Sequence, residues 1–249
     1  MKRIVAAMVL CGALGAAGYA QEVTSPVLRH IHYFVVLPGN HAPTIRVDTR
    51  PFYTYGEGVT IEIDDRAGNV LFEGMAPLGQ SLERTVATGG SDALLVVADP
   101  GYNGIVFSAD APWCVYVGGM WGLGTNRAVP PMSLWVPPDC MRFTVRAHAP
   151  SPGESGRVMV SDPSGTEVAV LDGELDEPEE IEVEVPAEQR GAIWTLSWGA
   201  PQTAGGSLDD LNTFVSGELT PVLWPTAEWA EEFGQMLWER HRAAVEDEE

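Results

Sequence analysis

The feature that most constrains the fold is a hairpin pattern that occurs twice, about 100 residues apart. Residues 61–74 read IEIDDRAGNVLFEG, and residues 158–173 read VMVSDPSGTEVAVLDG. In both, apolar and polar residues alternate before a four-residue turn, at 65–68 and at 162–165, that starts with Asp and ends with Gly. This composition is typical of a type I turn whose Gly takes a positive φ and starts the return strand.

The similarity extends outward from the two hairpins. The segment YFVVLPGNHAPTIRV (33–47) resembles SLWVPPDCMRFTV (133–145), and DALLVVADPG (92–101) resembles GAIWTLSWG (191–199). A repeat of this length, with short strands and frequent Gly/Pro turns, indicates tandem domains.

We therefore predict an all-β fold of two tandem antiparallel β-sandwich domains, each of about seven strands. Domain 1 is predicted over 27–118 and domain 2 over 132–224, with a Gly/Pro-rich linker at 119–131 where the strand pattern stops. The alternative is one larger sandwich whose halves share strands.

The C-terminal segment departs from the repeat. Over 225–243 the sequence predicts a helix capped by Thr226. One face carries apolar residues at helical spacing, namely Trp229, Phe233, Met236 and Leu237. Such a stripe indicates a helix that packs on a domain, and binding of a partner is the alternative.

The first 20 residues have the pattern of a secretory signal peptide. Lys2 and Arg3 precede an apolar run to about Ala17, and small residues lead up to a cleavage site after Ala20. No later stretch has the length of a transmembrane helix. We expect a protein that is secreted or periplasmic and not embedded in a membrane.

The charge balance excludes several partners. Cleavage after Ala20 removes two of the 14 basic residues and none of the 35 acidic ones, leaving 12 − 35 = −23. A surface this acidic repels nucleic acid and anionic membranes. We predict no cofactor, although the acids could collect calcium; the alternative is a solvated acidic surface. In the densest run, 172–186, acids alternate with apolar residues as in a strand with one wet face.

Two cysteines, Cys114 and Cys140, remain after cleavage. In an exported chain they could form a disulfide across the middle of the protein, or both could be free buried thiols. Cysteine spacing alone does not establish a pairing.

The second copy resembles a known family. The segments WVPPDCMRFTV (135–145), VMVSDPSGTEVA (158–169) and IEVEVPAEQRGAIWTLSW (181–198) are similar to the bacterial pre-peptidase C-terminal domain. The resemblance covers residues 132–198 well and the first copy weakly. It implies a non-catalytic β-sandwich, related to carbohydrate-binding and immunoglobulin-like domains, that accompanies secreted enzymes; some members bind calcium.

Motifs that would indicate catalysis are absent from the sequence. It contains no G-x-S-x-G elbow, no H-E-x-x-H and no phosphate-binding glycine loop. His30 and His32 would share one face of a strand and, with His41, could hold a metal; edge-strand histidines without a metal are the alternative. Asp65 and Asp162 are turn residues and weak candidates for calcium. We predict that the protein is not an enzyme, with a metal-assisted hydrolase as a distant alternative.

The predicted ligand site is Trp121, with Arg127 near it. Trp121 stands in GGMWGLG, where the neighbouring glycines offer little side-chain mass to bury the indole. An exposed indole could stack on a sugar ring, and Arg127 could donate hydrogen bonds; packing between domains is the alternative role. The predicted function is a ligand-binding accessory module for a polysaccharide or a cell-surface protein. The alternative is a structural or assembly component of the bacterial envelope.

Overall fold

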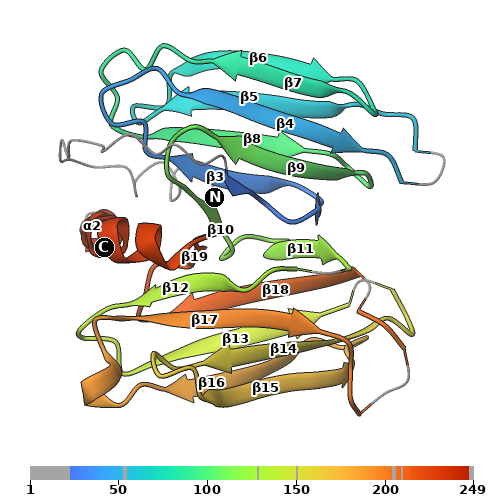
Figure 1. The fold of residues 1–249 in the computed structure, drawn as a ribbon, viewed down its shortest axis with the longest axis vertical. Helices are drawn as coiled ribbons and strands as arrows, with labels where there is room; N and C mark the ends of the chain where they lie inside the picture. Colours follow the sequence, from blue (N-terminus) through green and yellow to red (C-terminus); the bar gives the residue numbers. More distant parts are fainter. Residues whose placement is uncertain are drawn as a thin grey trace. The chain divides into compact units, whose positions relative to one another are not determined.

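The structure is a computed structural model that describes residues 23–52, 55–127, 129–149, 151–203, 206–208 and 210–246. The predicted signal peptide lies outside these residues. The described chain consists of antiparallel strands, the short 3-10 helix η1 (Ala187–Gln189) and the long helix α2 (Ala227–Glu246) (Figure 1). The predicted fold class, an all-β sandwich fold with a C-terminal α-helix, is confirmed.

The chain divides into two compact units, which we call unit 1 and unit 2. Unit 1 comprises residues 1–115 and 239–249, and unit 2 comprises residues 116–238. In Figure 1 the strands of unit 1 run from blue to green and those of unit 2 from light green to orange. The strands of unit 1 are β1 (Val23–Thr24), β2 (Leu28–Arg29), β3 (His32–Val36), β4 (Thr44–Arg50), β5 (Val59–Asp65), β6 (Val70–Ala76), β7 (Ser81–Thr85), β8 (Leu94–Asp99), β9 (Gly104–Ala109) and β10 (Trp113–Tyr116), which ends at the boundary.

Unit 1 is a long hairpin rolled into two sheets. Strands β2 to β9 pair from the outside inward, as β2 with β9, β3 with β8, β4 with β7 and β5 with β6. Two further pairings, β4 with β9 and β5 with β8, close the roll. The result is one sheet in the order β2-β9-β4-β7 and another in the order β3-β8-β5-β6, with β10 added beside β3 and β1 beside β9.

Unit 2 follows the same scheme with its own strands. They are β11 (Leu123–Asn126), β12 (Met132–Val136), β13 (Arg142–His148), β14 (Ser155–Ser161), β15 (Glu167–Glu174), β16 (Glu179–Glu184), β17 (Ala192–Gly199), β18 (Asp210–Gly217) and β19 (Val222–Leu223). Here β11 pairs with β18, β12 with β17, β13 with β16 and β14 with β15. Pairings of β13 with β18 and β14 with β17 close this roll as well.

The strand order of each unit is that of a jelly roll, in which eight antiparallel strands form two four-stranded sheets. It differs from the immunoglobulin-like order, whose sheets hold the first, second, fifth and fourth strands and the third, sixth and seventh. Both are two-sheet sandwiches, so the sequence pattern fits either.

The two hairpins that the sequence repeats are built from the same contacts. The N–H of Gly68 donates to the carbonyl of Asp65 (3.0 Å), and that of Gly165 donates to Asp162 (2.9 Å). Both glycines have φ of 82°. Each hairpin shifts register by one residue just before its turn, after Ile63 and after Val160. The predicted turns are confirmed, and the shift is the bulge that accompanies a glycine of positive φ.

Aromatic rings join the two sheets of each unit. In unit 1, Phe34 of β3 stacks on Phe107 of β9 with ring centroids 3.9 Å apart, and Trp113 contacts both rings edge-on. In unit 2, Phe143 of β13 meets Trp194 of β17 at right angles, 5.6 Å apart. All five side chains are at most 1% exposed, so these pairs form the cores of the sandwiches.

The predicted linker, residues 119–131, differs from the expectation because it contains β11. This strand pairs with β18 and belongs to unit 2. Its glycines serve close backbone packing: Gly122 has φ of 55°, and a Cβ there would collide with the carbonyl of Thr213. The same Gly residues that look like a flexible linker in sequence therefore allow a short strand to dock.

The C-terminal helix packs on a domain, as predicted. The Thr226 hydroxyl accepts a hydrogen bond from the N–H of Trp229 (3.3 Å) and caps its first turn. Phe233 stacks on Trp224, with centroids 6.2 Å apart, and Gly234 lies against the Trp135 ring. Residues 227–238 of α2 thus belong to unit 2.

Candidate functional site

The two residues of the predicted ligand site, Trp121 and Arg127, lie at opposite ends of a strand. Trp121 is half-buried in the turn before β11, and Arg127 is exposed directly after it. The four residues of β11 lie between them and span about 13 Å at ~3.3 Å per residue. The two residues of the predicted site are therefore separated along the backbone by the length of β11, and the ligand site at Trp121 stays a prediction.

His30 and His32 are buried within unit 1, whereas the His41 side chain is exposed. His32 is in β3, which lies between β10 and β8, so it is not on an edge strand as the alternative expected. Its Nδ1 donates to the carbonyl of His30 (3.0 Å). His41 instead lies 3.5 Å from Asp110. Among the described residues, no three His, Cys, Asp or Glu side chains are grouped so that they could hold a metal ion.

Burial lowers the pKa of both histidines to about 4. For His30 the Arg29 guanidinium adds to the lowering and Asp99 opposes it. For His32 the hydrogen bond to His30 opposes it only in part. Both imidazoles are therefore neutral at pH 7.

Asp65 and Asp162 act as turn caps. Asp162 Oδ1 accepts hydrogen bonds from the hydroxyl and N–H of Ser164 and from the N–H of Thr166, and Oδ2 accepts one from Gln189. These bonds, that of the Ser164 hydroxyl first, lower the pKa of Asp162. At Asp65 partial burial raises the pKa, but hydrogen bonds from Asn69, Ala67 and Gly68 outweigh it and the net shift is downward. The carboxylate oxygens of both residues therefore accept hydrogen bonds within their own hairpins, and calcium binding at these sites stays a prediction.

Cys114 and Cys140 are free, buried thiols, so the disulfide that the sequence left open does not form. Cys114 belongs to unit 1 and Cys140 to unit 2. Burial raises the pKa of Cys114 strongly, against a hydrogen bond with Val35. Burial also raises the pKa of Cys140, to about 11, and its Sγ donates to the carbonyl of Arg142 (3.3 Å). Neither thiol forms a reactive thiolate at neutral pH.

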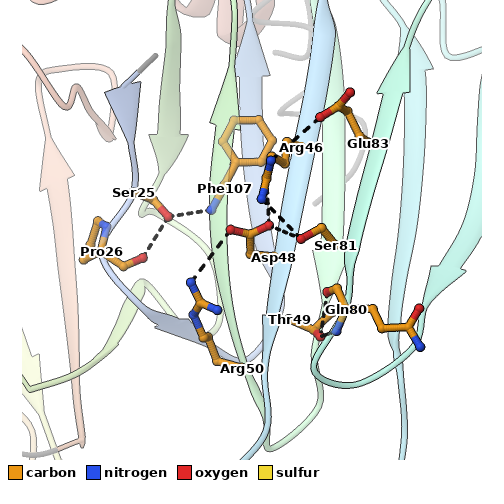
Figure 2. Close-up of polar contacts among 10 residues, drawn as sticks. All are labelled: Ser25, Pro26, Arg46, Asp48, Thr49, Arg50, Gln80, Ser81, Glu83 and Phe107. Carbon is orange, nitrogen blue, oxygen red and sulfur yellow. Dashed lines mark hydrogen bonds and ion pairs between the residues drawn. The ribbon is translucent and has the colours of Figure 1, made fainter. Parts of the chain in front are cut away.

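A carboxylate-centred network covers one stretch of the sheet β2-β9-β4-β7 (Figure 2). Asp48 accepts hydrogen bonds from Arg46 Nε (2.8 Å) and from the Ser81 hydroxyl (2.5 Å), and Arg50 Nη2 lies 3.8 Å away. Burial alone would raise the pKa of Asp48, but Ser81 and then Arg46 and Arg50 lower it. The Asp48 carboxylate therefore links β4 to β7 through the Ser81 hydroxyl.

The most exposed aromatic pair of the described residues is Tyr55 and Tyr102, which sequence reasoning missed. Tyr55 is 44% exposed and lies between β4 and β5; Tyr102 is 61% exposed and lies in the turn between β8 and β9. Their rings stack with centroids 5.2 Å apart and an angle of 28° between their planes. We call this pair, with Arg29, His30 and Phe52 beneath it, the tyrosine site.

Buried polar groups hold Tyr102 from below. Arg29 Nη2 donates to the Tyr102 carbonyl (3.2 Å), and the Arg29 guanidinium lies 5.4 Å from the centre of the Phe52 ring. His30 meets the Tyr102 ring at 79° with centroids 6.4 Å apart. Because His30 has φ of 66°, a conformation that non-glycine residues seldom adopt, the chain turns sharply here and brings the imidazole beneath the turn.

Asn103 fastens the two loops that carry the tyrosines. It is 1% exposed; its Oδ1 accepts from the N–H of Phe52 (3.0 Å) and its Nδ2 donates to the carbonyl of Glu57 (3.2 Å). Gly104 leaves room for the Phe52 ring, which lies 2.6 Å from where a Cβ would be. The site is thus an exposed aromatic surface whose two loops are joined by Asn103.

A sequence signal for Tyr102 exists. It stands in Pro100-Gly101-Tyr102-Asn103-Gly104, where small turn residues cannot bury a large ring. The reasoning that selected Trp121 applies equally to it. Nothing comparable identifies Tyr55 as its partner, because the two are 47 positions apart in the chain (102 − 55).

Comparisons with known proteins identify no family for this chain. No family model matches it, and no curated protein matches its sequence. Among solved structures, it is similar to the STIV major capsid protein, with 10% identity, 86% of this chain and 94% of that chain covered, and a TM-score of 0.21. None of the helices in the described part of the chain combines the length and the apolar character that crossing a bilayer requires.

Proposed function

We propose that this chain is an exported, non-catalytic β-sandwich protein that binds a carbohydrate through the tyrosine site. The observation that carries the proposal is the stacked and exposed pair of Tyr55 and Tyr102 on a buried polar base. A tyrosine ring offers a flat apolar face with few rotamers to fix and a hydroxyl that can donate or accept hydrogen bonds. A sugar ring presents matching C–H and hydroxyl groups.

Two features of the sequence support export and an accessory role. The first 20 residues have the charge and apolar pattern of a signal peptide. The second copy resembles the pre-peptidase C-terminal domain, whose members accompany secreted enzymes. We further propose that the two units arose as tandem copies, which would explain their shared pairing scheme and the offset of 97 residues between the hairpin turns (162 − 65).

Binding of soluble polysaccharides by the purified mature protein tests the proposal. Affinity electrophoresis and calorimetry against glucans, mannans, xylans and galactans should identify at least one ligand. Tyr102→Ala and Tyr55→Ala should each weaken it about tenfold, since loss of a well-packed aromatic contact costs on the order of 1–2 kcal/mol.

Matched variants separate stacking from general disturbance. Tyr102→Phe keeps the ring and should retain affinity within about threefold. Met120→Ala removes another exposed apolar side chain, 72% exposed, and should change nothing. If a Tyr55/Tyr102 double Ala variant binds as the parent does, or if no polysaccharide binds, the proposal fails and a structural role in the envelope becomes the better hypothesis.

A further inference from the structure

The charges around the tyrosine site are arranged unevenly, with the positive groups held in contacts of their own. Arg29 is only 9% exposed, and its guanidinium is committed to the Tyr102 carbonyl and the Phe52 ring. Arg50, which pairs with Gly104 across the strands, extends its guanidinium to Asp48 (Figure 2). Arg29 is therefore buried, and Arg50, whose side chain is 51% exposed, directs its guanidinium toward Asp48.

The negative groups lie on the loops that carry the tyrosines. Glu57 is exposed two residues after Tyr55, and its backbone carbonyl, not its carboxylate, accepts the hydrogen bond from Asn103. Asp99 is partly exposed three residues before Tyr102 and accepts from the N–H of Gly101 (2.9 Å). A bound acidic sugar would therefore meet like charges on both loops, while the Arg29 guanidinium is held by the Tyr102 carbonyl and the Phe52 ring.

The long-range field acts in the same direction. The full chain has 14 basic and 35 acidic residues, a formal charge of −21. A polyanion approaching such a surface is repelled over about 10 Å at 0.1 M salt. An aromatic cage for a cationic group is also unsuited to the geometry, because the two rings stack on each other and leave no space between their faces for an ammonium.

We infer that the tyrosine site binds an uncharged glycan and discriminates against acidic ones. This inference rests on the proposed carbohydrate-binding function and specifies its ligand class. The interaction is ring stacking with hydrogen bonds, and both depend little on ionic strength.

A set of polysaccharides with one backbone and different charges provides the test, once a neutral ligand has been found. Dextran, dextran sulfate and diethylaminoethyl-dextran are compared, together with the neutral ligand, alginate and chitosan, at low and at moderate NaCl concentration. The affinity for the neutral ligand should change less than about twofold with salt. Acidic polysaccharides should bind at least about tenfold more weakly.

Two variants connect these measurements to the site. Glu57→Lys places a cation beside Tyr55 and should strengthen binding of the acidic polysaccharides severalfold, with the neutral ligand changed less than about twofold. Tyr102→Ala should weaken neutral binding about tenfold but leave any salt-sensitive attraction of chitosan to the acidic surface intact.

The outcomes separate the inference from the function on which it rests. An acidic or cationic polysaccharide that binds as tightly as the neutral ones, and loses this binding in Tyr102→Ala, overturns the inference while the binding function stands. Absence of binding to every polysaccharide defeats the proposed function itself.

Discussion

At the scale of the residue, two corners of the chain share an unusual backbone conformation. His30 and Arg127 have φ of 66° and 68° and are the two non-glycine residues with positive φ in the described chain. Each directly follows the first strand of its roll, β2 or β11, where the chain leaves one sheet for the other. Such a conformation costs on the order of 1 kcal/mol for a residue with a Cβ. The sequence suggests both residues as binding residues because of their side chains. What they share in the structure is a backbone conformation of positive φ.

Because the pKa values of the buried histidines are lowered, we expect the free energy of unfolding to fall on mild acidification. Because the folded pKa of His32 is about 4 and its ordinary pKa is 6.5, the unfolded chain binds more protons between these pH values. The contribution of His32 to the free energy of unfolding should be fully present above pH 6.5. It should fall as the pH drops from 6.5 to 4 and then level off. The contribution of His32 is about 3 kcal/mol at most, at ~1.36 kcal/mol per pKa unit. Urea unfolding across this pH range measures it.

Substitution of one histidine at a time assigns this slope. His32→Gln should reduce the slope between pH 4 and 6.5 without removing it, because His30, whose pKa is also lowered to about 4, keeps its own contribution. The double variant of His30 and His32 should reduce the slope further. The lowered pKa values of Asp48, Asp65 and Asp162 act below pH 3.8 and do not overlap this window. An unchanged slope in His32→Gln would contradict the assignment.

At the scale of the element, the hairpins and the loops are determined in different ways. The turns 65–68 and 162–165 form from their own residues, because Asp caps the turn and Gly takes the positive φ. The loop that carries Tyr55 depends instead on a residue of another turn, Asn103, which bonds to both of its ends. The positions of Phe52 and Glu57 on either side of Tyr55 therefore depend on tertiary contacts.

Loss of the Asn103 side chain should loosen the tyrosine site. In Asn103→Ala, the N–H of Phe52 and the carbonyl of Glu57 lose their partner, and the free energy of unfolding should fall by about 1–3 kcal/mol. Affinity for the neutral ligand should fall severalfold because Tyr55 is no longer fixed beside Tyr102. Thermal unfolding and calorimetric titration well below the unfolding midpoint measure the two effects.

Asn69→Ala is the matched control. Asn69 also uses its side chain in a turn, where it donates to Asp65 (2.8 Å), but that turn is exposed and lies at the opposite end of β5 from Tyr55. Asn69→Ala should lower the free energy of unfolding by less than about 1 kcal/mol and leave ligand affinity unchanged. Equal effects of both variants on affinity would show that Asn103 does not position the loop.

At the scale of the whole molecule, net charge dominates the electrostatics outside the two cores. The chain has 35 acidic and 14 basic residues, and repulsion among the like charges destabilises the folded state. Local pairs such as Arg142 with Glu182, 3.4 Å apart across β13 and β16, relieve this only locally, and surface pairs contribute little. The Glu-rich strand β16 lies at the edge of its sheet, where charged side chains discourage pairing with another chain.

Salt should therefore stabilise the protein. Raising NaCl from about 10 mM to about 0.5 M shortens the screening length from about 30 Å to about 4 Å, and the midpoint of thermal unfolding should rise by several degrees. Calcium chloride at matched ionic strength distinguishes screening from a calcium site. The same increase with both salts is expected, and a larger increase with calcium that Asp162→Asn removes would instead support calcium binding there. A midpoint that falls with NaCl would contradict the prediction.

The sequence by itself determined what local rules decide. Alternation of apolar and polar residues marks strands, and Asp-x-x-Gly marks their turns. Helical spacing of Trp229, Phe233 and Leu237 marks a packed helix, because neighbouring residues suffice to express these preferences. Those rules predict two antiparallel sandwiches, but they do not distinguish a jelly roll from other sandwich orders, because strand order depends on pairings between residues far apart.

Features that depend on contacts between residues far apart in the chain were decided only by the tertiary structure. Strand β11 forms inside a Gly-rich segment because β18 supplies its hydrogen bonds. Cys114 and Cys140 remain thiols because each is enclosed by its own unit. Tyr55 and Tyr102 meet because Asn103 fixes one loop against another. Local sequence sets which backbone conformations are favourable, whereas a site assembled from separate loops exists only after long-range packing has offset the entropy of closing them.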